Sequence, residues 1–95
     1  MNAPRLLAYI WEDEVSEVID ALVGLDIRYL AVQRAIERII ETGIILEYSV
    51  PIVIDDEVVY VHRVPEFFVG MIPLVVLYIH DENDVVTVLE LRMVS

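Results

Sequence analysis

The last quarter of the chain has the clearest pattern of apolar and polar positions. Two runs rich in β-branched and aromatic residues, PLVVLYIH and VVTVLELRMV, flank the four polar residues DEND. This composition predicts a β-hairpin with an acidic turn. A turn of two or four residues would place Ile79 opposite Val86 and put Tyr78 on the other face. Both faces are apolar, whereas a sheet with one wet side alternates, so we expect both faces of this hairpin to be covered.

The first half of the chain reads as a short strand followed by two helices. Residues 5–11 (RLLAYIW) are an apolar run before a cluster of acids, which predicts a first strand. Between Asp13 and Gly24 the apolar residues recur at the spacing of one helix face, with acids on the opposite face. A similar spacing from Asp26 to Gly43 predicts a second helix. Because glycine favours helix ends, we expect Gly24 to end the first helix and Gly43 the second. Two helices joined by so short a connection are expected to form a hairpin.

After the second helix the pattern changes to that of strands. The runs IILEYSVPIVI and EVVYVHRV surround Asp55 and Asp56, which predicts a second hairpin, and Pro51 favours a sheet edge or a bulge. The stretch PEFFVGMIP reads as a connection in which Phe67 and Phe68 are buried anchors. The chain is therefore predicted to be a single α+β domain. It has an N-terminal strand, a helical hairpin on one face of the sheet, and three to four antiparallel strands.

The charge and composition of the chain indicate which classes of molecule it can bind. Seventeen acids stand against six basic residues, all of them arginine, and the formal net charge is −11. Binding to nucleic acid depends on clustered cations, so a nucleic-acid partner is disfavoured. Hydrophobic residues make up 58% of the chain, above the usual ~45–50%. Since so small a chain cannot hide them all, we expect a homo-oligomer, most simply a dimer, or a bound protein partner.

The sequence also predicts where the protein works. It contains no cysteine, which is compatible with a reducing cytoplasm. The N-terminus has no apolar segment of the secretory type. The longest apolar run, residues 67–79, is interrupted by Gly70 and Pro73 and falls short of the ~20 residues that span a bilayer. We therefore expect a cytoplasmic protein that is not in the membrane.

The order of elements and the terminal hairpin resemble a known group of proteins. A strand, a helical hairpin ending in glycine, the segment YVHRV and the hairpin VVLYIHDENDVVTVLELR are together similar to the RelE/ParE toxin superfamily, over residues 6–92. The resemblance implies a toxin-type or toxin-derived protein of a toxin–antitoxin module that acts through protein partners, with an antitoxin peptide as one candidate. By the same resemblance Arg63 lies on a strand that carries basic residues, Tyr78 matches the hairpin tyrosine, and Arg92 lies near the terminal basic position. The hairpin arginine of the family falls on Val75 here, and the chain has no lysine, which weighs against mRNA cleavage.

A ribonuclease of this kind needs a proton acceptor, a proton donor and cations that stabilise the phosphorane. The candidate catalytic residues are Arg63, Tyr78, His80 and Arg92. In the predicted hairpin Tyr78 and His80 share a face and Arg92 lies on the other, so a single site is not favoured. The alternative interpretation is that Tyr78 is a core aromatic and Arg92 pairs with Glu90.

Other chemistry has little support in the sequence. The acidic clusters at residues 55–57 and 81–84 lack the glycine that a calcium loop needs at its sixth position, so we interpret them as solvated turns. We predict no metal site and no cofactor. The alternative to the toxin-type function is a non-enzymatic homo-oligomeric interaction module. It is motivated by the net charge, by Val75 and by a second apolar sheet face that two helices cannot cover.

Overall fold

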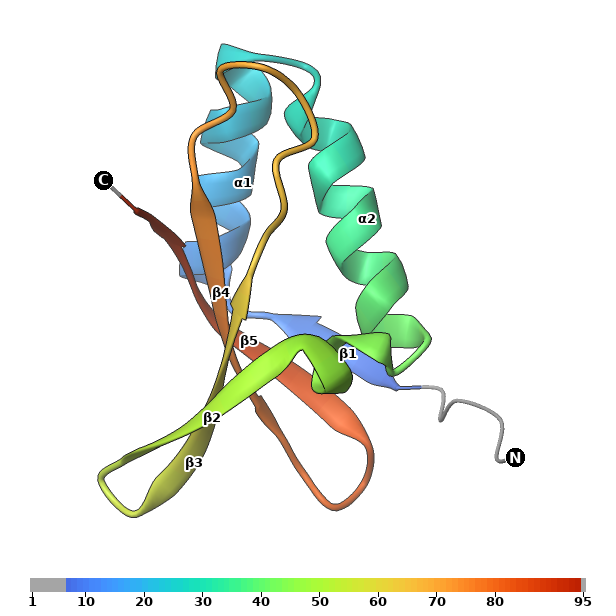
Figure 1. The fold of residues 1–95 in the computed structure, drawn as a ribbon, viewed down its shortest axis with the longest axis vertical. Coiled ribbons are helices and arrows are strands. Elements are labelled where there is room, and N and C mark those ends of the chain that lie inside the picture. The colour runs from blue at the N-terminus through green and yellow to red at the C-terminus, as the bar shows by residue number, and fades with distance from the viewer. Residues whose placement is uncertain (1–6, 95) are drawn as a thin grey trace.

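The computed structural model describes residues 7–94, so Arg5 and Leu6 of the predicted first strand lie outside the described residues. The chain folds as a strand, two helices, a short 3₁₀ helix and four further strands (Figure 1). Their bounds are β1 (Ala8–Trp11), α1 (Asp13–Leu25), α2 (Tyr29–Glu41), η1 (Ile44–Tyr48), β2 (Ser49–Ile54), β3 (Glu57–Arg63), β4 (Leu74–His80) and β5 (Val85–Met93). The predicted α+β class is confirmed.

All five strands form one mixed sheet in the order β1-β5-β4-β3-β2. β1 is parallel to β5, and the other neighbouring pairs are antiparallel. Both helices lie on the same side of this strongly twisted sheet, and the β2–β3 hairpin extends away from them (Figure 1). The predicted placement of the helices on one face is therefore confirmed, and the sheet has a face that neither helix covers.

The helices bury the stripes that their spacing predicts. Val15, Ile19 and Leu22 of α1 are buried, and so are Val32, Ile36 and Ile40 of α2. These side chains pack against Leu74, Val76, Tyr78, Val86, Val88 and Leu91 of the sheet. This is one contiguous core, and we call the side of the sheet that faces it the covered face.

The register of the β4–β5 hairpin differs from the prediction. Ile79 pairs with Thr87 rather than with Val86, because five residues separate the paired ends His80 and Val86. Asp84 adds the extra residue to the turn by taking a left-handed backbone conformation, with φ of 60°. An odd number of turn residues moves the first part of β5 to the opposite face. Val86 therefore joins the core on the side of Tyr78.

A second irregularity restores the pattern further along β5. The pairing shifts between Leu77 and Tyr78, so that Leu77 lies opposite Glu90 and Tyr78 lies opposite Val88. Leu89 is the extra residue of this β-bulge. If Leu89 continued the regular pairing, the alternation would direct the Glu90 carboxylate into the core; because the bulge takes up Leu89, Leu91 is buried instead.

The connection between β3 and β4 also differs in part from the prediction. Phe67 is 49% exposed, so it is not the buried anchor that was expected. Phe68 does pack against the core, edge-on to Tyr29 with the ring centres 5.1 Å apart. Arg28 lies over the same ring, 4.2 Å from its centre. Of the two aromatic residues, only Phe68 therefore anchors the β3–β4 connection to the core.

The β2–β3 hairpin follows the prediction from Ser49 onward, whereas Ile44–Tyr48, predicted as the start of its first strand, form the 3₁₀ helix η1 instead. Asp55 and Asp56 both adopt left-handed backbone conformations, with φ of 50° and 65°, as a two-residue turn between twisted strands requires. Pro51 lies in β2, which is the edge strand. Because proline has no N–H to donate, it is tolerated at such an edge and limits edge-to-edge pairing with another sheet.

The face of the sheet opposite the helices is largely aliphatic, and we call it the open face. The register of the strands assigns to it Ile52, Val59, Val61, Val75, Leu77, Ile79 and Thr87. Most of these side chains are partly exposed, while Val59 is buried between its cross-strand neighbours. Within residues 7–94 no helix packs on this face, so the expectation that the terminal hairpin is covered on both sides is not met within one chain.

Candidate functional site

Tyr78 is part of the core rather than of an accessible site. Its side chain is fully buried on the covered face, and its ring stacks on Tyr60 with the centres 5.3 Å apart. The hydroxyl donates a hydrogen bond of 2.6 Å to Ser49 Oγ, which in turn donates to the Ile45 carbonyl, also at 2.6 Å. Burial raises the pKa of the Tyr78 phenol above its ordinary value. These contacts fit the interpretation of Tyr78 as a core aromatic.

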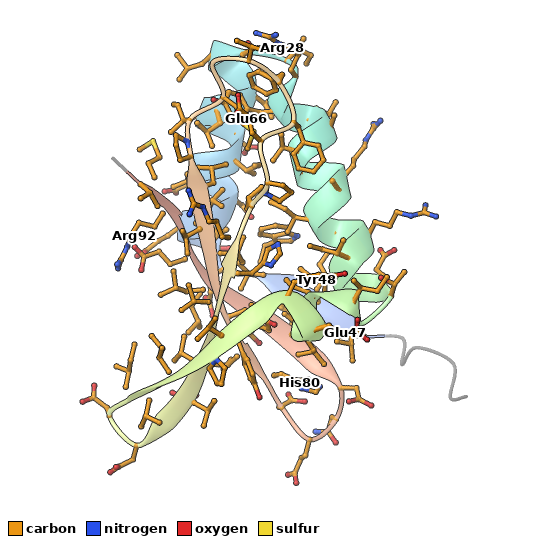
Figure 2. The ribbon with its side chains drawn as sticks, viewed as in Figure 1. Arg28, Glu47, Tyr48, Glu66, His80 and Arg92 are labelled. Atoms are coloured by element: carbon orange, nitrogen blue, oxygen red, sulfur yellow. The ribbon has the colours of Figure 1, made fainter. Side chains whose placement is uncertain are left out.

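His80 and Arg92 each have a carboxylate partner. The Nε2 atom of His80 lies 3.0 Å from Asp84 Oδ1, next to the turn of the terminal hairpin. The guanidinium of Arg92 makes two hydrogen bonds to Glu90, of 2.9 and 3.0 Å. Figure 2 shows His80 and Arg92 at opposite ends of the β4–β5 hairpin. These two candidates therefore cannot act on one bond, and the predicted Arg92–Glu90 pair is present.

Arg63 and Arg92 are the two candidate residues that the sheet brings together. Val75 of β4 pairs with Arg63 on one side and with Arg92 on the other. Residues in register on neighbouring strands share a face, so both arginines lie at one end of the open face. They are two strand spacings apart, roughly 10 Å. Val75 therefore occupies the position between two cations, on the opposite face from Tyr78.

The open face has few acids although the chain is strongly acidic. Of the 17 acids, the strands of the open face contribute only Glu57 and Glu90. The others lie in the helices, the hairpin turns, the 3₁₀ helix and the connections. Arg63 and Arg92 offset the charge of these two glutamates. The open face is therefore close to electrically balanced, and the −11 charge lies around it rather than on it.

The structure also contains a groove that the sequence did not indicate. It has a volume of about 410 Å³ and lies between α2, η1 and the stretch that starts at His62 and runs to Phe67. Its lining is almost entirely aliphatic and aromatic. His62 lies in its wall and is 95% buried, the remaining 5% being exposed. Periodicity does not predict such a groove, because its residues come from three separate segments.

The comparisons with known proteins do not extend these observations. No family model, no curated protein and no solved structure matches the chain. The likeness to the RelE/ParE superfamily therefore rests on the motifs of the sequence alone. Neither helix in the described part of the chain has the length and apolar character needed to span a bilayer. Among residues 7–94, no three His, Asp or Glu side chains come together in a way that could hold a metal ion.

Proposed function

We propose that the protein is a non-enzymatic interaction module that forms a homodimer through the open face of its sheet. The observation that carries the proposal is the set of aliphatic side chains on three adjacent strands that neither helix covers. A contiguous apolar patch of this kind marks an interaction site on a small protein. The proposal includes a cytoplasmic location, which the absence of cysteine supports.

The free energy gained by burying the apolar side chains of the open face agrees with a reversible dimer. Full burial of a Val, Leu or Ile side chain contributes ~1.5–3 kcal/mol. Most of the open face is already partly covered by neighbouring strands, so roughly half of that remains for each side chain. Six aliphatic side chains in each of two copies then give roughly 9–18 kcal/mol, against the ~4–15 kcal/mol that association costs. With a cost near the lower end of that range the surplus is about 8 kcal/mol, which corresponds to a dimer that forms at micromolar rather than nanomolar concentration.

The charges favour a second copy of this chain over a highly charged partner. The open face carries two arginines and two glutamates, so two copies related by a two-fold axis can oppose unlike charges. The acidic turns lie at the ends of the hairpins, where they remain in water at the rim of such a contact. The partial block that Pro51 places on the edge strand also favours face-to-face over edge-to-edge association.

Sedimentation equilibrium of the purified chain tests the proposal. Association predicts a mass of twice 10.9 kDa at tens of micromolar, falling toward 10.9 kDa on dilution. The dimer should persist at high salt, because burial of apolar surface drives it and screening reduces the repulsion between the acidic chains. A mass of 10.9 kDa at every concentration would contradict the proposal.

A second candidate is a toxin-derived protein of a toxin–antitoxin module whose partner is an antitoxin peptide. The observation in its favour is the position of Arg63 and Arg92 on either side of Val75, together with the resemblance of the terminal hairpin. Expression in a bacterial host distinguishes the candidates. The toxin-derived protein should co-purify with a small protein encoded next to its own reading frame. Growth arrest with cleavage of ribosome-bound mRNA, lost in Arg63→Ala, would instead establish an active enzyme.

A further inference from the structure

His62 carries a hydrogen-bond acceptor that the chain itself does not use. Its Nδ1 lies 3.2 Å from the Tyr48 carbonyl oxygen. A carbonyl oxygen only accepts, so Nδ1 is the protonated nitrogen and Nε2 carries the free lone pair. Nε2 is buried, and no residue of the described part of the chain donates to it. An acceptor left in this state costs about 1–3 kcal/mol, so a ligand that supplies a donor recovers part of that cost.

The groove around His62 is suited to a small apolar molecule. Its volume of about 410 Å³ lies within the ~300–1,000 Å³ of known small-molecule sites. Ala35, Ile36 and Ile39 of α2 form one wall, and the stretch that ends at Phe67 forms the other. The lining offers very little polar surface. A few polar groups in an apolar groove are what fixes the orientation of a bound molecule.

The margin of the groove is formed in part by exposed side chains. Tyr48 is 69% exposed and Phe67 is 49% exposed, and both lie at the margin of the groove. Figure 2 shows Tyr48 beside the end of α2 that lies next to η1. Exposed side chains exchange rotamers on the picosecond to nanosecond timescale. A ligand that enters the groove therefore meets side chains that adjust to it without a change in the backbone.

The charge of the site and of the chain restricts the ligand further. The desolvation of the buried ring lowers the pKa of His62 below its ordinary value, so the imidazole is neutral at pH 7. A neutral imidazole accepts at Nε2 and carries no positive charge for an anion, and the groove exposes very little polar surface although Arg63 is among the residues that line it. The net charge of −11 also repels anions. These properties favour an uncharged ligand with one hydrogen-bond donor.

We propose that the groove between α2 and the segment after β3 binds a small neutral molecule, with an aromatic or aliphatic body and a hydroxyl group that donates to His62 Nε2. The site lies on the helix side of the sheet, and of the residues that line it only Arg63 also lies on the open face, so binding does not depend on the proposed dimer. Because Nε2 is the one orphaned acceptor in the wall, the hydroxyl determines both the orientation and the selectivity of binding.

Titration of the full chain with p-cresol and p-xylene tests the proposal, because the two probes differ only by a hydroxyl in place of a methyl group. The chemical shifts of backbone amides along α2 and residues 62–67 report binding. We expect p-cresol to bind wild type at least as tightly as p-xylene does. We expect His62→Phe to weaken p-cresol about tenfold and p-xylene by less than twofold. Equal losses for the two probes, or no binding of either, would overturn the proposal.

A second measurement applies even where His62→Phe does not fold. The ¹⁵N resonance of His62 Nε2 in wild type should move upfield when p-cresol binds and should not move with p-xylene, since accepting a hydrogen bond changes the shielding of that nitrogen. Ile39→Trp serves as the matched control, because it fills the groove and leaves the imidazole in place. It should abolish binding of both probes. A p-cresol-dependent shift that persists in Ile39→Trp would show that the hydroxyl binds elsewhere.

Discussion

Tyr78 and Ile79 are neighbours in β4 that point to opposite faces of the same sheet. Tyr78 lies on the covered face, is fully buried and has a hydrogen-bond partner for its hydroxyl. Ile79 lies on the open face, is partly exposed and pairs with Thr87 of β5. The two faces have nearly the same aliphatic composition, so the difference does not come from the residue types. It arises because two helices can cover only one side, which leaves the other available for association.

The bulge in β5 determines which of Glu90 and Leu91 faces the core, and a change at these two positions should have the largest effect. Exchange of the two residues, in the double variant Glu90→Leu and Leu91→Glu, keeps the composition of the chain and places a carboxylate at the buried position. Burial of an unpaired carboxylate is strongly unfavourable. We therefore expect the exchange variant to show no cooperative unfolding transition in urea by circular dichroism. Leu89→Thr leaves Glu90 and Leu91 in place and should lose only about 1 kcal/mol. An exchange variant as stable as wild type would show that the bulge does not assign the faces.

A matched pair of isoleucines compares the two faces directly. Ile36 is 1% exposed beneath the covered face, and Ile36→Ala should cost about 2–5 kcal/mol at every protein concentration. Ile79→Ala on the open face should cost less, and its cost should decrease on dilution because the wild-type dimer then dissociates. Urea unfolding at several protein concentrations measures both effects. Losses of equal size, both independent of concentration, would contradict the proposed difference between the faces.

The hydroxyl of Tyr78 provides a smaller test of the covered face. Tyr78→Phe removes the hydrogen bond to Ser49, while Ser49 keeps its bond to the Ile45 carbonyl. We expect a loss of about 0.5–1.5 kcal/mol in the free energy of unfolding. Tyr60→Phe, at a half-buried tyrosine stacked on Tyr78, is the control and should change stability by less than about 0.5 kcal/mol. A larger loss for the control would mean that the hydrogen bond adds little.

The buried imidazole predicts a modest dependence of stability on pH. Desolvation lowers the pKa of His62 in the folded chain, so the unfolded chain takes up a proton at higher pH than the folded one. The contribution of His62 is therefore fully present above the unfolded pKa of about 6.5 and is lost as pH falls below it. Urea unfolding at pH 7.5 and 5.5 should show a smaller decrease for His62→Phe than for wild type. Equal decreases in the free energy of unfolding of the two proteins would mean that groups other than His62 cause the pH dependence.

Most of the fold could be predicted because each element has its own local signal. The helices follow from apolar spacing and the end of α2 from Gly43, although α1 continues through Gly24 to Leu25. The edge position of β2 follows from Pro51. The register of the terminal hairpin could not be predicted. With apolar residues on both faces, the pattern gives no preference between an even and an odd turn, so neither the turn residue Asp84 nor the extra residue Leu89 could be recognised.

The candidate site was predictable only in part, for a related reason. The pairing of Arg92 with Glu90 and the core position of Tyr78 follow from local spacing. The approach of Arg63 to Arg92 depends on the register across three strands, which local patterns do not specify. The orphaned acceptor of His62 depends on its contact with Tyr48, 14 residues away. Such features are properties of the tertiary structure and have no signature in the sequence.

The central claim, that the open face joins two copies of the chain, is tested most directly by sedimentation equilibrium of two matched variants. Leu77 lies at the centre of the open face between Val61 and Glu90, and Val69 is 90% exposed in the connection between β3 and β4. At tens of micromolar, wild type and Val69→Glu should sediment at twice 10.9 kDa, and Leu77→Glu at 10.9 kDa with an unchanged circular dichroism spectrum. A Leu77→Glu variant that remains dimeric, or a wild type that is monomeric, would contradict the claim.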